Sequence, residues 1–278
     1  MRIIVTDVEV FKYDWIAVFL DTVSGEWAVF HNDNQGVRDY MSQPDRIYCT
    51  FNGKHYDNFC LKAMCCGADP TLIKQINDFI IVDKRNGWDH WFIRKNKFWF
   101  NNFDLADDTQ QGTSLKHYEA HSFVDIEESE VDFGLDRPLT PEELESTIHY
   151  CKWDVWNTAR LLTTRKGYLD TKLNVGRMIE SPDEKSLYCT NALLTAKALK
   201  AVATERYDER EYQYPDNLRK DLIPSEVLEF FDRIHDTSIP SKDYFKSSLV
   251  INIGECEVKI GFGGIHAAIP NYIGGDNR

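Results

Sequence analysis

The sequence predicts an α/β protein with a mixed sheet flanked by helices, followed by a helical and irregular C-terminal extension. Strand-like segments dominate the chain up to Phe51, and segments with helical spacing of apolar residues follow them. The 278 residues, 42% hydrophobic and 13% aromatic, are enough to bury a core. We expect three parts, at residues 1–165, 166–245 (a helical connector) and 246–278.

Apolar runs that end at turn residues predict the strands of the first part, at 2–8, 16–20, 26–30 and 46–51. The second and third flank a turn at Val23-Ser24-Gly25, which favours an antiparallel meander. Apolar spacing or capping residues predict its helices, at 34–41, 56–66, 71–82, 114–118 and 140–165. The last of these begins with Thr140-Pro141-Glu142-Glu143, a cap, a proline and two acids at the positive end of the helix dipole.

Beyond residue 165, the sequence predicts a helix at 191–204 and a strand pair at 249–253 and 257–262. Residues 84–100 combine five basic with six aromatic residues around Asn86-Gly87, a dipeptide typical of hairpin turns. Two interpretations stay open. The segment is a hairpin or loop that stacks nucleobases and contacts phosphates, or it is a hairpin whose aromatic face packs on the core. We favour packing, because an aromatic count is a weak signal of binding.

The net charge of −13 limits the classes of function. A protein that holds nucleic acid through phosphate contacts alone is usually basic. Carboxylates that bind metal ions reverse the local field, so an acidic chain is compatible with a metal-dependent nuclease. The seven cysteines form no CxxC pair, and we expect reduced thiols and no structural zinc. No apolar run approaches the roughly 20 residues of a membrane span, and we expect a cytoplasmic protein without a membrane partner.

Candidate chemistry begins with Asp7 and Glu9, at i and i+2 near the end of the first strand. Their side chains leave the same face of that strand. Two neighbouring carboxylates in an apolar setting repel each other and lose solvation unless a cation lies between them. The alternative is a strand end at the surface with two solvated acids.

Two further patterns follow along the chain. Asp57 opens a helix directly after a strand, five residues beyond Asn52, where an acid also serves as ordinary helix capping. Tyr150 and Asp154 lie at i and i+4 of a helix, so the phenol and the carboxylate share one face. The alternative for this pair is a tyrosine at the core edge beside an exposed acid.

In this order, DxE, Nx3YD and Yx3D resemble the three motifs of the DEDDy class of 3′→5′ exonucleases, which have a ribonuclease H-like fold. The resemblance covers about the first 165 residues. It implies a water-orienting tyrosine and four metal-binding acids, here Tyr150, Asp7, Glu9, Asp57 and Asp154. Carboxylate oxygens suit Mg²⁺ or Mn²⁺. Two such ions would clamp the scissile phosphate.

The chain is most similar to the proofreading domains of bacteriophage DNA polymerases of family B. Ser114-Leu115-Lys116 lies between the second and third motifs, where such domains carry a helix near the bound strand. Residues 261–266 (GFGGIH) loosely resemble the glycine motif that links exonuclease to polymerase, with glycine where tyrosine is usual. Polymerase motifs are absent from these residues. We expect an exonuclease subunit with a separate polymerase, or part of a longer polymerase, working in the host cytoplasm.

The resemblance implies that the protein removes mononucleotides from the 3′ end of single-stranded DNA. Phe51 and Asn52 would position the terminal nucleotide, and Lys116 would contact a phosphate unless it is only a solvated charge. Two rival functions stay open. One is a 3′→5′ exoribonuclease of the ribonuclease D type, which has the same motifs. The other is a non-catalytic module that binds a DNA polymerase subunit or the template strand.

Overall fold

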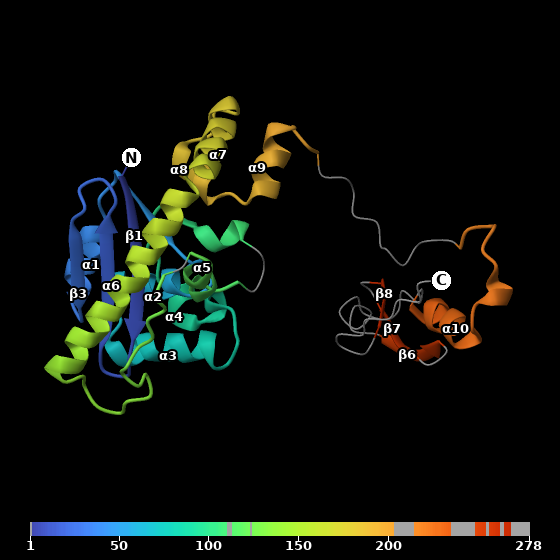
Figure 1. Ribbon diagram of the computed structural model, residues 1–278, viewed down its shortest axis with the longest axis horizontal. Helices are drawn as coiled ribbons and strands as arrows, with labels where there is room; N and C mark the ends of the chain where they lie inside the picture. The colour runs from blue at the N-terminus through green and yellow to red at the C-terminus, as the bar shows by residue number, and fades with distance from the viewer. Residues whose placement is uncertain are drawn as a thin grey trace. The chain divides into compact units, whose positions relative to one another are not determined.

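The computed structural model describes residues 2–109, 113–122, 124–202, 214–234, 248–253, 256–261 and 264–267. The chain divides into two compact units, Met1–Ala201 and Val202–Arg278 (Figure 1). Each unit is described by itself. Among the described residues, no helix has the length and apolar character needed to cross a membrane.

A five-stranded mixed sheet in the order β3-β2-β1-β4-β5 forms the centre of the larger unit. Its strands are β1 (Arg2–Val10), β2 (Trp15–Asp21), β3 (Trp27–His31), β4 (Arg46–Thr50) and β5 (Asn102–Asp104). Of these five, β2 alone runs against the others, since it pairs antiparallel with β1 and β3 while β4 pairs parallel with β1 and β5. The central position of β1 draws its side chains into the protein interior.

Helices cover both faces of this sheet (Figure 1). The first core cluster joins one face to α1 (Asn34–Met41), α2 (Asp57–Cys65), α3 (Pro70–Ile81) and α4 (Trp91–Lys95). The second joins the other face to α6 (Pro141–Thr164), α7 (Lys166–Met178) and α8 (Asp183–Tyr188). Along β1, Ile4 and Val8 belong to the first cluster and Val5 to the second. Since side chains alternate along a strand, Asp7 and Glu9 face α6 with Val5.

The start of α6 confirms the expected capping sequence. Thr140 Oγ1 accepts the Glu143 N–H at 3.2 Å, and Glu143 Oε2 accepts the Thr140 N–H at 2.9 Å, which completes a capping box. Cys151 and Val155 are fully buried on the side of α6 that packs on β1 and β2. The helix is therefore held at its N-terminus and along its apolar face.

The other predicted elements of the first part are confirmed to within one or two residues at most of their ends, including the antiparallel pairing of β2 with β3. Outside residues 84–100, two described elements of this part were not predicted: the short strand β5 and the 3-10 helix η2 (Leu105–Asp108). The helix α5 (Leu115–His121) begins where predicted, with Ser114 as its N-cap.

The hairpin predicted around Asn86-Gly87 is wrong. This stretch contains a 3-10 helix, η1 (Gly87–Asp89), followed by α4. The Asn86 side chain caps η1 by accepting the Trp88 N–H at 3.0 Å. A Cβ at position 87 would lie 2.5 Å from the Phe59 ring, so glycine here permits a close approach of two segments. The dipeptide that resembles a hairpin turn is thus explained by a helix cap and a tertiary contact.

The larger unit continues past residue 165, the boundary expected from the sequence, to Ala201. Its second core cluster includes Leu169 and Leu173 of α7 and Leu187 of α8. These leucines explain why the compact unit extends so far. The helix expected at 191–204 is shorter in the structure, α9 (Asn191–Ala198), and residues 203 and 204 lie outside the described part.

The smaller unit contains the 3-10 helix η3 (Lys220–Leu222), α10 (Ser225–Ile234) and the antiparallel sheet β6-β7-β8. These strands are β6 (Ser248–Ile253), β7 (Cys256–Gly261) and β8 (Gly264–Ala267). The predicted strand pair is therefore confirmed. Its described core consists of Val227, Phe230, Val258 and Ile260. Within the glycine motif at 261–266, Phe262 and Gly263 lie outside the described residues.

Candidate metal centre

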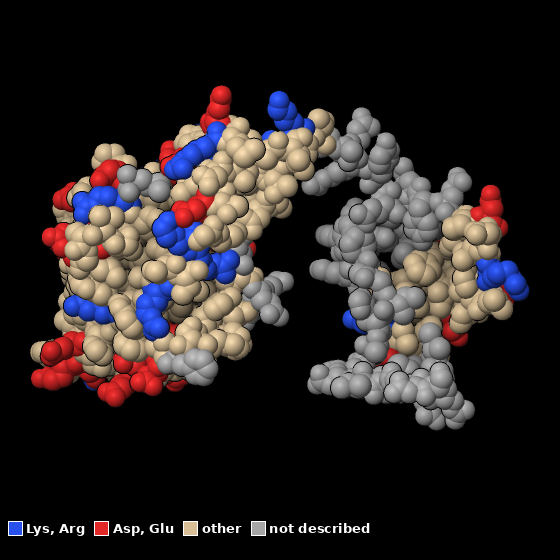
Figure 2. All heavy atoms as spheres, turned by 45° about the horizontal axis from the view of Figure 1, so that its top comes forward, with Lys and Arg blue, Asp and Glu red and all other residues tan. Residues whose placement is uncertain are grey.

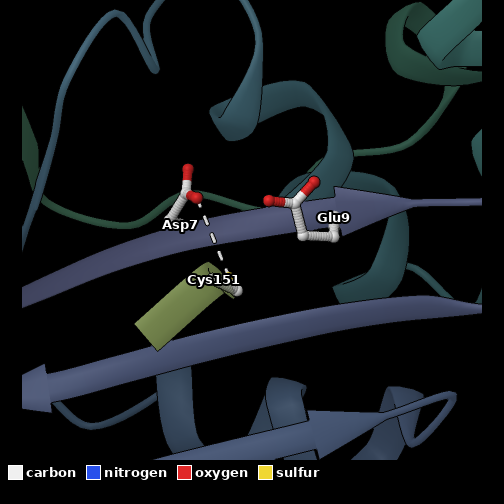
Figure 3. A group of neighbouring side chains, drawn as sticks. All are labelled: Asp7, Glu9 and Cys151. Atoms are coloured by element: carbon white, nitrogen blue, oxygen red, sulfur yellow. Dashed lines mark hydrogen bonds between the residues drawn. The ribbon is translucent and has the colours of Figure 1, made fainter. Parts of the chain in front are cut away.

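Asp7 and Glu9 rise from the same side of β1, and Cys151 of α6 lies beside Asp7 (Figure 3). One ligand atom from each of the three lies within 4.8 Å of the others. Glu9 is 8% exposed and Asp7 is half-buried, so the two acids are not fully solvated at the surface, as the alternative would have them. Both carboxylates therefore lie between β1 and α6.

Cys151 is the member of this group that sequence reasoning missed. Its thiol donates a hydrogen bond to Asp7 Oδ2 at 3.8 Å. Burial, followed by the charge of Asp7, raises the pKa of the Cys151 thiol well above its usual range. A protonated thiol is a hydrogen-bond donor and a poor metal ligand. The signal that points to it is its position beside Tyr150, on a helix turn that already carries two candidate residues.

Burial and like charges raise the pKa values of the acids in this centre. The pKa of Asp7 rises from 3.8 to about 7, first through burial and then through the charge of Asp154. Burial and then Asp7 raise the pKa values of Glu9 and of Asp57 well above their usual range. Burial also raises the pKa of Asp154. Asp57 and Asp154 therefore lie within electrostatic reach of the pair on β1, although outside the group that meets within 4.8 Å.

Asp57 is the first residue of α2 and is 5% exposed. The N-cap residue of α2 is Tyr56, whose side chain makes no capping bond, and the Asp57 carboxylate lies in the acidic cluster. Asp104 holds the loop that precedes Asp57. The two carboxylate oxygens of Asp104 accept the Asn52 N–H at 2.7 Å and the Lys54 N–H at 2.8 Å. Asp104 thus links β5 to the centre, a role that sequence reasoning missed.

Tyr150 and Asp154 share one face of α6, as predicted, and the charge of Asp154 acts on the Tyr150 phenol. Burial, followed by the charge of Asp154, raises the pKa of Tyr150. The phenol therefore remains protonated at neutral pH. It stays available as a hydrogen-bond donor beside the carboxylates.

Lys116 lies at the centre and is not a solvated charge. Its ammonium pairs with Asp154 Oδ1 at 2.6 Å and lies 3.6 Å from Glu119 Oε2. Glu119, which is 3% exposed, accepts a hydrogen bond from Asn157 at 3.1 Å. These contacts join α5 to α6. The lysine predicted to contact a phosphate is thus the counter-ion of one acid of the centre.

Phe51 and Asn52 lie on the loop that leads from β4 to Asp57. The Phe51 ring packs edge-on against Tyr118 of α5, with ring centroids 5.9 Å apart. Asn52 is exposed and has a φ of 66°, in the left-handed region that asparagine tolerates. Both residues lie on the loop that leads to the centre. Phe51 contacts α5, and the Asn52 N–H is bound by Asp104 of β5.

The donor set fits a hard divalent cation. Asp7, Glu9, Asp57 and Asp154 offer only oxygen atoms, which Mg²⁺ and Mn²⁺ prefer. Their pKa values are raised by burial and by one another's charge, so the surrounding protein groups compensate their negative charge poorly. A bound cation would relieve this repulsion. Comparison of the chain with protein-family models, with curated proteins and with solved structures finds no match.

Proposed function

We propose that the protein is a metal-dependent 3′→5′ exonuclease that removes mononucleotides from single-stranded DNA. The observation that carries this proposal is the cluster of Asp7, Glu9, Asp57 and Asp154. These acids come from β1, α2 and α6, and burial raises the pKa of each. Such a cluster is disfavoured unless cations occupy it.

The direction of degradation, the DNA substrate and a proofreading role in DNA replication rest on the resemblance of the three motifs to bacteriophage polymerase domains. So does a DNA polymerase partner. The five-stranded sheet, in which β2 alone is antiparallel, is compatible with the ribonuclease H-like fold that this resemblance implies. The fold therefore supports the proposal without carrying it.

The four acids would hold two Mg²⁺ or Mn²⁺ ions. When bound, such ions supply an activated water and positive charge for the leaving oxygen. The Tyr150 hydroxyl, which is protonated at neutral pH and lies on the same face of α6 as Asp154, would orient a water molecule. The Lys116 ammonium pairs with Asp154. Phe51 and Asn52, on the loop before Asp57, would position the terminal nucleotide.

The experiment that tests the proposal is the release of labelled mononucleotide from a 3′-labelled single-stranded DNA oligonucleotide. We expect release by the wild type in Mg²⁺ or Mn²⁺, none in EDTA, and loss of release in Asp7→Ala. The control variant is Glu145→Gln, which removes an exposed carboxylate of α6. Absence of release by the wild type in either metal, or full activity in Asp7→Ala, would overturn the proposal.

The same assay separates the two rival functions. The metal centre does not read the 2′ position, so the two enzymes are separated by their substrate preference. A ribonuclease D type enzyme would degrade a matched RNA oligonucleotide in preference to the DNA. A non-catalytic module would bind DNA tightly and release no nucleotide in Mg²⁺. The proposal predicts turnover, with the DNA oligonucleotide preferred.

A further inference from the structure

A groove of about 530 Å³ lies in the larger unit, outside the candidate metal centre. It runs between α2, the segment 88–102 and the helices α8 and α9. We call it the lysine–tryptophan groove, and the lining residues that matter here are Asn58, Lys62, Trp88, Trp99, Lys185 and Lys197. None of the four acids of the metal centre lines it.

Consecutive residues of α2 belong to the metal centre and to the groove. Asp57, the first residue of α2, belongs to the acidic cluster, whereas the next residue, Asn58, lines the groove. Lys62 lies four residues beyond Asn58, on the same face of α2. The helix therefore presents one side to the acids and another to the groove.

Two exposed indole rings form the aromatic part of the groove. Trp99 is 76% exposed and Trp88 is 47% exposed, and their ring centroids are 6.3 Å apart. The Lys62 ammonium lies 5.0 Å and 5.9 Å from these two centroids and donates to the Ile93 carbonyl at 3.0 Å. A buried cation thus holds both rings in place while they stay open to solvent.

Positive charge also lines the groove. The described lining contains four lysines and one glutamate, in a chain whose net charge is −13. Figure 2 shows a dense group of Asp and Glu at the lower end of the larger unit, and Lys and Arg interspersed with further acids over the rest of the drawn face. Lys54 pairs with Asp107, but Lys185 and Lys197, both exposed, form no carboxylate ion pair within the described part of the chain. Their charge is therefore available to an anionic ligand.

We propose that the lysine–tryptophan groove binds single-stranded nucleic acid, with bases stacked on Trp88 and Trp99 and phosphates near Lys185 and Lys197. Aromatic platforms beside unpaired cations bind single strands without sequence preference, since every base offers a stacking face. A duplex hides those faces. The inference rests on the proposed function for the substrate class: it assigns a site for a part of the strand that lies outside the metal centre.

The aromatic contribution is tested by fluorescence anisotropy with a labelled oligothymidylate in EDTA, where no hydrolysis is expected. Trp99→Ala should raise Kd by about 5- to 100-fold, the usual effect of losing one base-stacking ring. Trp91→Ala is the matched control, because Trp91 is 58% exposed and lies outside the lining. It should change Kd by less than about twofold. Trp99→Phe keeps a stacking ring and should restore most of the affinity.

The lysines are tested through the salt dependence of the same binding. Removing two phosphate contacts lowers the slope of log Kobs against log salt by about 1.4 for a single strand. We expect this change in the double variant Lys185→Ala, Lys197→Ala. The charge-matched control replaces Lys95 and Lys200, which are exposed and outside the lining. An unchanged slope in the first double variant would contradict the inference.

Failure of this inference is distinguishable from failure of the proposed function. Wild-type affinity in Trp99→Ala, no binding of the oligothymidylate by the wild type, or equal affinity for a duplex of the same length would overturn the groove assignment. Metal-dependent nucleotide release would be untouched by those results. Conversely, groove-dependent binding without nucleotide release would support the groove and overturn the nuclease.

Discussion

Replacing Asp7 with asparagine is expected to stabilise the metal-free protein at pH 8. The pKa of Asp7 is raised from 3.8 to about 7, so the native state holds this proton more tightly than the unfolded state does. The sign follows from linkage: as pH rises from about 4 to 7, the unfolded chain ionises first and native stability is lost. A shift of about three pKa units corresponds to about 4 kcal/mol. Asparagine carries no charge, and we expect it to recover about 2–4 kcal/mol above pH 7.

Urea unfolding followed by tryptophan fluorescence in EDTA measures this difference in the larger unit, because all seven tryptophans lie in it. The wild type, Asp7→Asn and the control Glu145→Gln would be compared at pH 5 and pH 8. The gain of Asp7→Asn should be largest at pH 8 and smaller at pH 5. Equal stability of the two proteins at pH 8, or a larger gain at pH 5, would refute the reasoning. Mg²⁺ should stabilise the wild type, by linkage to binding, and Asp7→Asn much less.

Three further predictions concern the same unit. Asp154→Ala should lower the rate of nucleotide release by several orders of magnitude and Tyr150→Phe by about 10- to 100-fold, as initial rates in Mg²⁺ would show; equal losses would contradict the roles assigned to them. Lys116→Met leaves Asp154 without its cation and should reduce the free energy of unfolding in EDTA by about 1–3 kcal/mol, a loss that Mg²⁺ repairs. Gly87→Ala forces a Cβ against the Phe59 ring and should destabilise the unit by about 1–3 kcal/mol in urea unfolding. Gly167→Ala meets no atom within 4 Å in α7 and should be neutral or slightly stabilising.

The parts of the fold that follow local rules were predictable from the sequence. Alternation along β1 places Asp7 and Glu9 on one face, and the capping residues at Thr140 and Glu143 mark the start of α6. The i and i+4 spacing of Tyr150 and Asp154 likewise brings the phenol to the carboxylate. Each of these inferences needs only the residues of one element, which is why they hold.

The features that sequence reasoning missed depend on contacts between elements far apart in the chain. The strand β5 has three residues, too few for a recognisable pattern, yet its Asp104 holds the loop before Asp57. Lys116 and Asp154 are 38 positions apart, so their pairing is visible only when α5 meets α6. The sequence leaves open whether the aromatic residues of 84–100 pack on the core or bind a ligand. In the structure some of them are packed and others are exposed. Phe92, Phe98 and Phe100 pack on the core, whereas Trp88 and Trp99 are exposed in the groove.

The direct test of the metal centre is a Mn²⁺ titration followed by electron paramagnetic resonance, in which the free ion gives the signal. The account predicts that the wild type binds about two Mn²⁺ ions per chain. Asp7→Asn and Asp154→Asn should lose at least one of these ions, and Glu145→Gln should bind as the wild type does. No uptake of Mn²⁺ by the wild type, or unchanged uptake in Asp7→Asn, would contradict the claim that these buried carboxylates are a metal site.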